Sequence, residues 1–325
     1  MKLSSIFLVL SLAFTLSAQE PMMWQQRTDV GSPGLYEAAT MAFDAQQGVM
    51  LHFGGVKYVS GSPLGFASND LWQYNGAAWQ QVTVTGTLPV ARSGHAMVYD
   101  PVDGRVLMFG GDGGGAMLGD LWAFEFSGPA AGSWVQLASL PSAGRSIMAM
   151  GYDAARDEFI VTGGIKEGTA EVEPPNGPTY GTVKPATRET WLWNRTVWAA
   201  GPQAPEYING PTQNDVNYFI KAGPAGGVVA HHAESGKTML LSERIFAQLG
   251  LPFANYFYGA GDWPLYDGVQ WEANHGGIVS VLGGSFPRSF YTSSPTRVVA
   301  TYDPARRRVV AFGAGKTTSE EFTGT

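Results

Sequence analysis

The sequence of 325 residues contains no cysteine. This absence excludes disulfide bridges, a cysteine nucleophile, thiolate metal sites and lipid attachment through an N-terminal cysteine. Stability must then come from the burial of apolar side chains, and a chain of this length can bury a sizeable core.

Charged side chains are also scarce, at 14% of the residues, against about 25% in an ordinary soluble domain. The 20 basic and 27 acidic side chains give a formal net charge of −7. The chain therefore has no broad cationic surface for a phosphate backbone or an anionic lipid, and we expect no nucleic-acid partner. The 43 glycines and 20 prolines disfavour long helices, while the apolar share of 44% is enough for a folded core.

Histidine is scarce as well, with five residues in the chain. His231 and His232 are adjacent, so on a strand they point to opposite faces and cannot readily hold one metal ion together. The segment Gly315-Lys316-Thr317 resembles the end of a phosphate-binding loop, but Val310 stands where that loop requires its first glycine. We therefore expect neither a metal nor another cofactor.

Long apolar runs are absent after the N-terminus, which itself has the layout of a secretory signal peptide. Lys2 precedes the apolar stretch Leu3–Leu16, and Ala18 offers a small residue for cleavage. We predict a signal peptide over residues 1–18, with cleavage after Ser17 as the alternative. The apolar stretch is too short to span a membrane, so the mature chain, one domain over residues 19–325, should be secreted to the extracellular space or periplasm.

What the chain does contain is an internal repeat. A typical copy begins with an aromatic residue followed by aspartate. Ten positions after the aromatic residue stands a residue that is followed by two glycines or by glycine and alanine. The first copy runs from Phe43-Asp44 to Phe53-Gly54-Gly55, and each copy predicts two strands joined by a tight turn. The aromatic positions of the successive copies are Phe43, Tyr99, Tyr152, His232 in a weaker fourth copy, and Tyr302.

A second repeated signal is a pair of tryptophans around a turn. Trp72 and Trp79 stand seven residues apart, as do Trp191 and Trp198. A version with a longer loop joins Trp122 to Trp134, and a weaker version ends at Trp271. Two further strands per unit follow, and a four-stranded antiparallel unit that recurs about every 50 residues is typical of a β-propeller blade.

The unit that begins at Tyr99 resembles a kelch repeat. The residues that carry the resemblance are Tyr99-Asp100, Gly110-Gly111, Asp120-Leu121-Trp122, Trp134, Leu140-Pro141 and, opening the next unit, Arg145. The resemblance implies an all-β, kelch-type β-propeller of four-stranded antiparallel blades, with about five blades in this chain. It also implies that Arg92 and His95 are buried and hydrogen-bonded at the start of a blade.

The N-terminal segment offers a way to close such a propeller. Trp24-Gln25-Gln26-Arg27 resembles Trp79-Gln80-Gln81-Val82, the predicted fourth strand of the first unit. The N-terminal strand would then complete the last blade. The alternative is a truncated six- or seven-bladed propeller, since the chain stops at Thr325 where a third strand would begin, and the sequence leaves both open.

The same resemblance bears on enzymatic activity. Some kelch-type propellers are copper radical oxidases that use a tyrosine cross-linked to a cysteine, and the lack of cysteine excludes that activity here. Others resemble sugar isomerases of the sialic-acid type, in which charged groups at the mouth of the propeller transfer protons. The candidates for this role are Arg145, Glu167, Glu243, Arg244 and Arg288. The simpler expectation for them is a solvated loop charge.

The repeated turn acids, which we expect to be structural and not the catalytic carboxylates of a glycosidase, are Asp44, Asp100, Asp153 and Asp303.

Three aromatic-rich insertions point instead to binding. They span about residues 165–188, 244–263 and 285–296, and loops on a rigid scaffold are where binding surfaces usually form. Aromatic rings beside arginine suit a sugar face or a protein partner, although the rings could equally hold the loops down. The residues predicted to bind are Tyr180, Arg244, Tyr256, Tyr258, Arg288 and Tyr291.

The sequence therefore predicts a binding module for an extracellular protein or glycan, more readily than an enzyme. The alternatives are a sugar-active enzyme of isomerase or lyase type and a purely structural propeller. No motif in the chain specifies the ligand or the oligomeric state.

Overall fold

A computed structural model describes residues 31–62, 64–169, 183–184, 186–205, 207–208, 221–222, 224–243, 247–248, 264–272, 299–303 and 308–312. One short 3-10 helix, η1 (Gly128–Ala130), accompanies the strands of this part. The strands are β1 (Leu35–Glu37), β2 (Thr40–Asp44), β3 (Val49–Phe53), β4 (Val56–Tyr58), β5 (Phe66–Ala67), β6 (Leu71–Tyr74), β7 (Trp79–Gln81), β8 (Ala96–Asp100), β9 (Arg105–Asp112), β10 (Met117–Glu125), β11 (Ser133–Gln136), β12 (Arg145–Ser146), β13 (Ala149–Asp153), β14 (Glu158–Thr162), β15 (Ile165–Lys166), β16 (Val183–Lys184), β17 (Thr190–Trp193), β18 (Trp198–Ala200), β19 (Tyr207–Ile208), β20 (Lys221–Ala222), β21 (Ala225–His232), β22 (Lys237–Glu243), β23 (Ala247–Gln248), β24 (Leu265–Tyr266), β25 (Trp271–Glu272), β26 (Val299–Asp303) and β27 (Arg308–Phe312).

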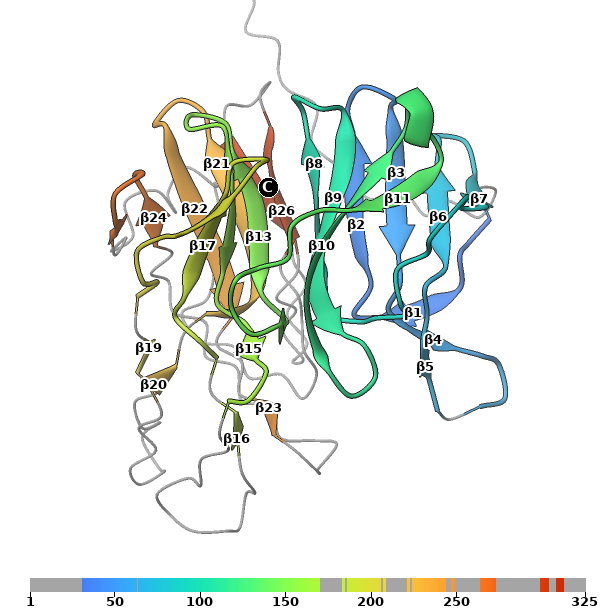
Figure 1. Cartoon of the computed structure of the whole chain (residues 1–325), viewed down its shortest axis with the longest axis horizontal. Coiled ribbons are helices and arrows are strands. Elements are labelled where there is room, and N and C mark those ends of the chain that lie inside the picture. Colours follow the sequence, from blue (N-terminus) through green and yellow to red (C-terminus); the bar gives the residue numbers. More distant parts are fainter. Residues whose placement is uncertain are drawn as a thin grey trace, which may run out of the picture.

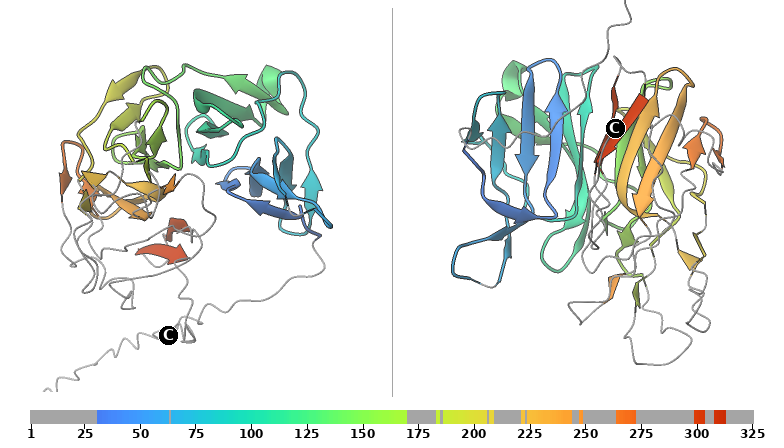
Figure 2. Two further views of the ribbon diagram at one scale, coloured as in Figure 1. Left: turned by 90° about the horizontal axis from the view of Figure 1, so that it is seen from below. Right: turned by 180° about the vertical axis from the view of Figure 1, so that it is seen from behind.

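Four antiparallel sheets of four strands form the body of the described molecule (Figure 1). We call them blades one to four, with the strand orders β2-β3-β6-β7, β8-β9-β10-β11, β13-β14-β17-β18 and β21-β22-β24-β25. The sheets stand around a common centre (Figure 2, left), where the innermost strands β2, β8, β13, β21 and β26 each contact the next. The arrangement is all-β and propeller-like, as the sequence predicts.

The repeated hairpins predicted from the sequence are confirmed. Tyr74 pairs with Trp79, and the equivalent pair of blade two, Phe124 and Trp134, encloses the longer loop that contains η1. The weak fourth unit is also a blade, because β21 and β22 pair around the turn at residues 233–236.

The number of blades and the closure of the propeller depend on residues outside the described part. Strands β26 and β27 pair with each other next to β21. The predicted signal peptide, Trp24 and the chain beyond Phe312 all lie outside the described residues. Within the described part, no helix has the length and apolarity that a membrane span needs.

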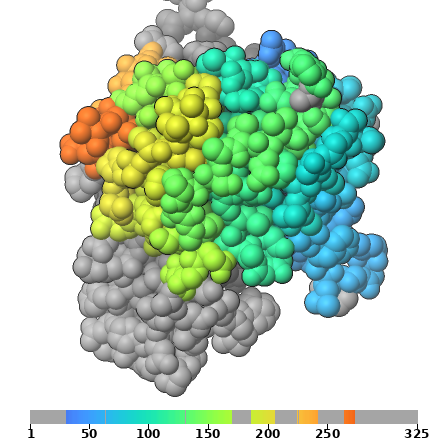
Figure 3. Space-filling model, in the orientation of Figure 1, coloured from blue at the N-terminus to red at the C-terminus, as the bar shows by residue number. Residues whose placement is uncertain are grey.

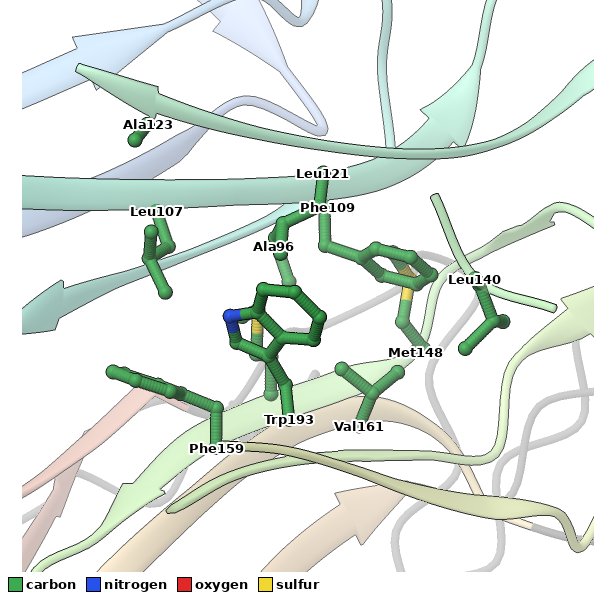
Figure 4. Packing of buried hydrophobic residues seen from close by; sticks show 11 residues of the cluster. Ala96, Leu107, Phe109, Leu121, Ala123, Leu140, Met148, Phe159, Val161 and Trp193 are labelled. Carbon is green, nitrogen blue, oxygen red and sulfur yellow. The ribbon is translucent and has the colours of Figure 1, made fainter. Parts of the chain in front are cut away.

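The core lies between neighbouring blades, where aromatic rings bridge one sheet to the next. The Phe53 ring of blade one lies 5.2 Å from the Trp134 ring of blade two, and Phe109 of blade two lies 5.5 Å from Trp198 of blade three. Figure 4 shows the second interface, where Trp193 is 2% exposed among apolar side chains of both sheets. These wide rings fill the wedge between the blades, as expected from the tryptophan repeat.

The repeated glycines allow the end of the second strand of one blade to lie in close contact with the segment that begins the next blade. A Cβ atom on Gly54 would come 2.7 Å from the carbonyl oxygen of Arg92, and one on Gly110 would come 2.7 Å from that of Arg145. Both glycines also have positive φ, at 63° and 66°, so any other residue would be strained there.

Candidate functional site

The two ends of the propeller differ in construction. The tight turns at residues 45–48, 101–104, 154–157 and 233–236 lie at the upper end in Figure 1, which we call the turn end. The opposite end, which we call the loop end, carries small additional sheets. They are β1-β4-β5, β12-β15, β16-β23 and β19-β20.

The loop end joins insertions from different blades. Strand β16 lies in the connection between the second and third strands of blade three, and β23 lies in the corresponding connection of blade four. The two strands pair with each other, Val183 with Gln248 and Lys184 with Ala247. Two of the insertions predicted to form a binding surface therefore meet.

The hairpin of β4 and β5 in blade one also projects from the loop end (Figure 3, light blue). It presents apolar side chains to solvent, with Leu64 77% and Phe66 53% exposed. The six residues predicted to bind a partner are not part of this hairpin. Their positions, all outside the described residues, are Tyr180, Arg244, Tyr256, Tyr258, Arg288 and Tyr291.

Arg145, a candidate for proton transfer, is fully buried at the loop end. Its Nη2 atom lies 2.7 Å from Oε2 of Glu189, while Lys166 Nζ lies 2.5 Å from the other carboxylate oxygen. Trp191 donates its indole N–H to the same carboxylate. Partial burial acts to raise the pKa of Glu189, but the hydrogen bonds from Lys166 and Arg145 outweigh it and lower that pKa to about 2.

The expectation of a solvated charge at Arg145 is thus wrong, and the reason is the repeat itself. Arg92 occupies the same position in blade two, where it is fully buried and contacts both oxygens of Asp120 at 2.8 Å. It also donates to the carbonyl of Gly110. The predicted burial of Arg92 and of His95, which is 3% exposed, is confirmed.

Blade one has an equivalent hydrogen-bonded network around an acid, made by different residues. The sequence did not lead us to predict these residues. Tyr36 stands eight residues before Asp44, just as Arg92 stands eight before Asp100. The Tyr36 hydroxyl donates to Asp70 at 2.6 Å, and Lys57 Nζ lies 2.6 Å from the same oxygen. The constant spacing within the repeat could have revealed Tyr36.

The other charged candidates have separate positions. Glu167 is exposed, and its Oε2 accepts the backbone N–H of Met117 at 2.7 Å, which connects a loop of blade three to the start of β10 in blade two. Glu243 is the last residue of β22, and Arg244 and Arg288 lie outside the described part. Neither Arg145 nor Glu167 lines the central cavity.

Three of the four turn acids are structural, as predicted. Asp44, Asp100 and Asp153 are fully buried, and each accepts backbone N–H groups of its own turn. Arg195 of blade three also reaches Asp100 of blade two, with Nη2 2.8 Å from Oδ1. Asp303 ends β26.

The adjacent histidines have different partners. His231 Nδ1 lies 3.0 Å from the Thr238 hydroxyl, and His232 Nδ1 lies 3.0 Å from the Ser235 hydroxyl. Among the described residues, no group of three or more histidines and acids could hold a metal ion.

A cavity of about 680 Å³ lies between the innermost strands β2, β8, β13 and β21. Backbone hydrogen bonds connect successive blades at its loop end, from Gly94 N to Ala38 O at 2.9 Å, from Ile147 N to Gly94 O at 2.7 Å and from Gly226 N to Ile147 O at 2.6 Å. All four residues have positive φ, so a left-handed residue recurs at or just before the start of each of these strands.

Comparison with known proteins supports the fold. No family model and no curated protein matches the chain. A solved structure titled "Structure of YjhT" is similar, with 14% sequence identity over 87% of this chain and 78% of that chain and a TM-score of 0.54. At this identity the likeness concerns the fold alone, so the class of protein is an all-β, propeller-like one.

Proposed function

We propose that the protein is a secreted kelch-type β-propeller that binds an extracellular protein or glycan through its loop end. The observation that carries the proposal is the difference between the two ends. Four small sheets, β1-β4-β5, β12-β15, β16-β23 and β19-β20, lie at the loop end, and β16 and β23 join the insertions of two blades there. Loops held on a rigid scaffold commonly form binding surfaces.

The kelch assignment rests on an arginine before the first strand, paired with an acid near the third strand, in blades two and three. Arg92 with Asp120 and Arg145 with Glu189 recur at equivalent places, and the glycines after the second strand make room for the next blade. Gly110, Asp120 and Arg145 are among the residues that carried the resemblance in the sequence.

A sugar-active enzyme is less well supported. That function would require charged side chains around the central cavity, but Arg145 is buried against Glu189 and Glu167 binds a backbone N–H. We therefore favour binding without chemical conversion.

The binding proposal is tested with the exported chain, residues 19–325, on a glycan array and against purified extracellular proteins of its source. We expect one class of ligand to bind with a micromolar or lower Kd, measured by calorimetry. The substitutions Arg244→Ala, Tyr256→Ala and Tyr258→Ala should weaken binding. Val269→Ser, which changes a 79% exposed residue in a turn outside the insertions, is the matched control and should bind normally.

Absence of binding at micromolar concentration, or equal loss in the Val269→Ser control, would contradict the proposal. Export is tested separately by the intact mass of the protein recovered outside the cytoplasm. We expect the chain to begin at Gln19, or at Ala18 if cleavage follows Ser17. A recovered chain that still begins at Met1 would contradict export through a cleaved signal peptide.

A further inference from the structure

The central cavity has a lining of its own, separate from the insertions at the loop end. The described part of its wall comes from the first strands of four blades and from the residues beside them. Met41 and Phe43 lie on the same face of β2 and are 54% and 51% exposed. The large apolar side chains in the wall are Met41, Phe43, Met50, Met97, Val98, Ile147, Met148, Met150, Val228 and Val229.

We infer that this cavity binds a neutral, apolar small molecule. Its volume of about 680 Å³ lies within the range of roughly 300–1,000 Å³ that is usual for ligand pockets. Among the described residues that line it there is no aspartate, glutamate, lysine or arginine. A charged ligand would therefore lose its hydration without an opposite charge to replace it.

Three polar side chains of the wall already have hydrogen-bond partners within the protein. The Thr40 hydroxyl donates to the carbonyl of His95 at 2.8 Å, and the Tyr152 hydroxyl donates to Asp157 at 2.7 Å. His231 Nδ1 lies 3.0 Å from the Thr238 hydroxyl. Sugar hydroxyl groups at these three side chains would have to compete with the bonds already made, so their desolvation would be poorly compensated there.

Methionine makes the wall adaptable. Its unbranched thioether side chain can change rotamer to fit ligands of different shape and makes favourable contacts with aromatic rings. Met41, Met97, Met148 and Met150 come from three successive blades. The ligand class indicated is therefore a compact aromatic or aliphatic molecule without charge.

The test uses two fluorescent probes with the same ring skeleton and different charge. N-phenylnaphthylamine is neutral, and anilinonaphthalene sulfonate carries a negative charge. We expect the full exported chain to bind one molecule of the neutral probe, with increased and blue-shifted emission, and to bind the sulfonate about tenfold or more weakly.

Three variants locate the probe. Met41→Glu introduces a charge at an exposed cavity position and should weaken binding of the neutral probe about tenfold or more, whereas Met41→Leu should bind it like the natural protein. Leu64→Glu makes the same kind of change on the β4–β5 hairpin, outside the cavity lining, and should leave binding unchanged. Thermal unfolding of each variant verifies that it is folded.

The inference is overturned if the neutral probe does not bind, if both probes bind equally, or if Leu64→Glu abolishes binding as Met41→Glu does. These outcomes are independent of the loop-end proposal, because the ligands and variants of that test do not involve the cavity. Binding of the neutral probe with no partner at the loop end would leave this inference intact and remove the proposed function.

Discussion

The guanidinium of Arg145 lies 2.7 Å from the carboxylate of Glu189, and the arginine side chain is fully buried while the glutamate is 25% exposed. Arg92 and Asp120 repeat this relationship one blade earlier at 2.8 Å. In both blades the arginine precedes the first strand and the acid stands at or near the start of the third strand. The pair therefore holds the segment before the first strand of the blade against the start of its third strand.

Replacement of Arg145 should destabilise the fold strongly. Arg145→Met leaves the Glu189 carboxylate without its buried cation, and breaking a buried pair by removing one partner costs about 3–5 kcal/mol. Urea unfolding measures the change in free energy. Lys166→Met removes the other cation from the same carboxylate but at a 31% exposed side chain, so it should cost about 1 kcal/mol or less. Equal effects of the two variants would contradict the structural role of Arg145.

Acid should unfold the protein partly through Glu189. The pKa of this carboxyl is lowered from 4.5 to about 2 in the folded state, so its contribution is complete above the unfolded pKa of 4.5. That contribution is lost as the pH falls from about 5 to 2, and it amounts to at most about 3 kcal/mol. Melting temperature measured against pH should therefore fall less steeply in Glu189→Gln than in the natural protein. A Glu189→Gln profile just as steep as that of the natural protein would refute the assignment.

The contact of Arg195 with Asp100 should hold blade three to blade two. Asp100 is fully buried, and Arg195 contacts both of its oxygens. Arg195→Ala should lower the free energy of unfolding by about 3 kcal/mol, measured by urea titration. Thr196→Ala, one residue further along the exposed turn, should change it by less than about 0.5 kcal/mol. A similar small effect for both variants would show that the interface does not depend on this pair.

The protein should be more stable with glycine in place of Ala38. Its φ is 56°, a conformation that costs an ordinary L-residue about 1–2 kcal/mol and costs glycine little. Ala38→Gly should therefore raise the free energy of unfolding by up to about 1 kcal/mol. Ala42→Gly, in regular β conformation four residues later, should lower it by about 1 kcal/mol. A destabilised Ala38→Gly variant would mean that the methyl group contributes more packing than strain.

The hairpins could be predicted from the sequence because the residues that specify each one lie within a short segment of the chain. The ten-residue spacing from Phe43 to Phe53 and the seven-residue spacing from Trp72 to Trp79 each include a turn and two pairing strands. The structure places Phe43 opposite Met50 and Tyr74 opposite Trp79 within those hairpins. Buried turn acids such as Asp100 were predictable for the same reason, because their partners lie two or three residues away.

The candidate site was far less predictable. The long loops were identified as insertions, but the pairing of β16 with β23 joins residues about sixty positions apart, which no local pattern encodes. Tyr36 was missed because its residue type differs from Arg92, although its spacing from the turn acid is the same.

The sequence by itself determined a repeated four-stranded unit, its turns and the aromatic side chains between units, because these depend on neighbours within one hairpin. Only the tertiary structure decided that Arg145 is a buried cation and that the first strands of four blades line a cavity with many apolar side chains. Both properties arise where packing brings together side chains of different loops or blades. Whether a charged residue such as Arg145 is buried, and which charges surround it, depends on that packing.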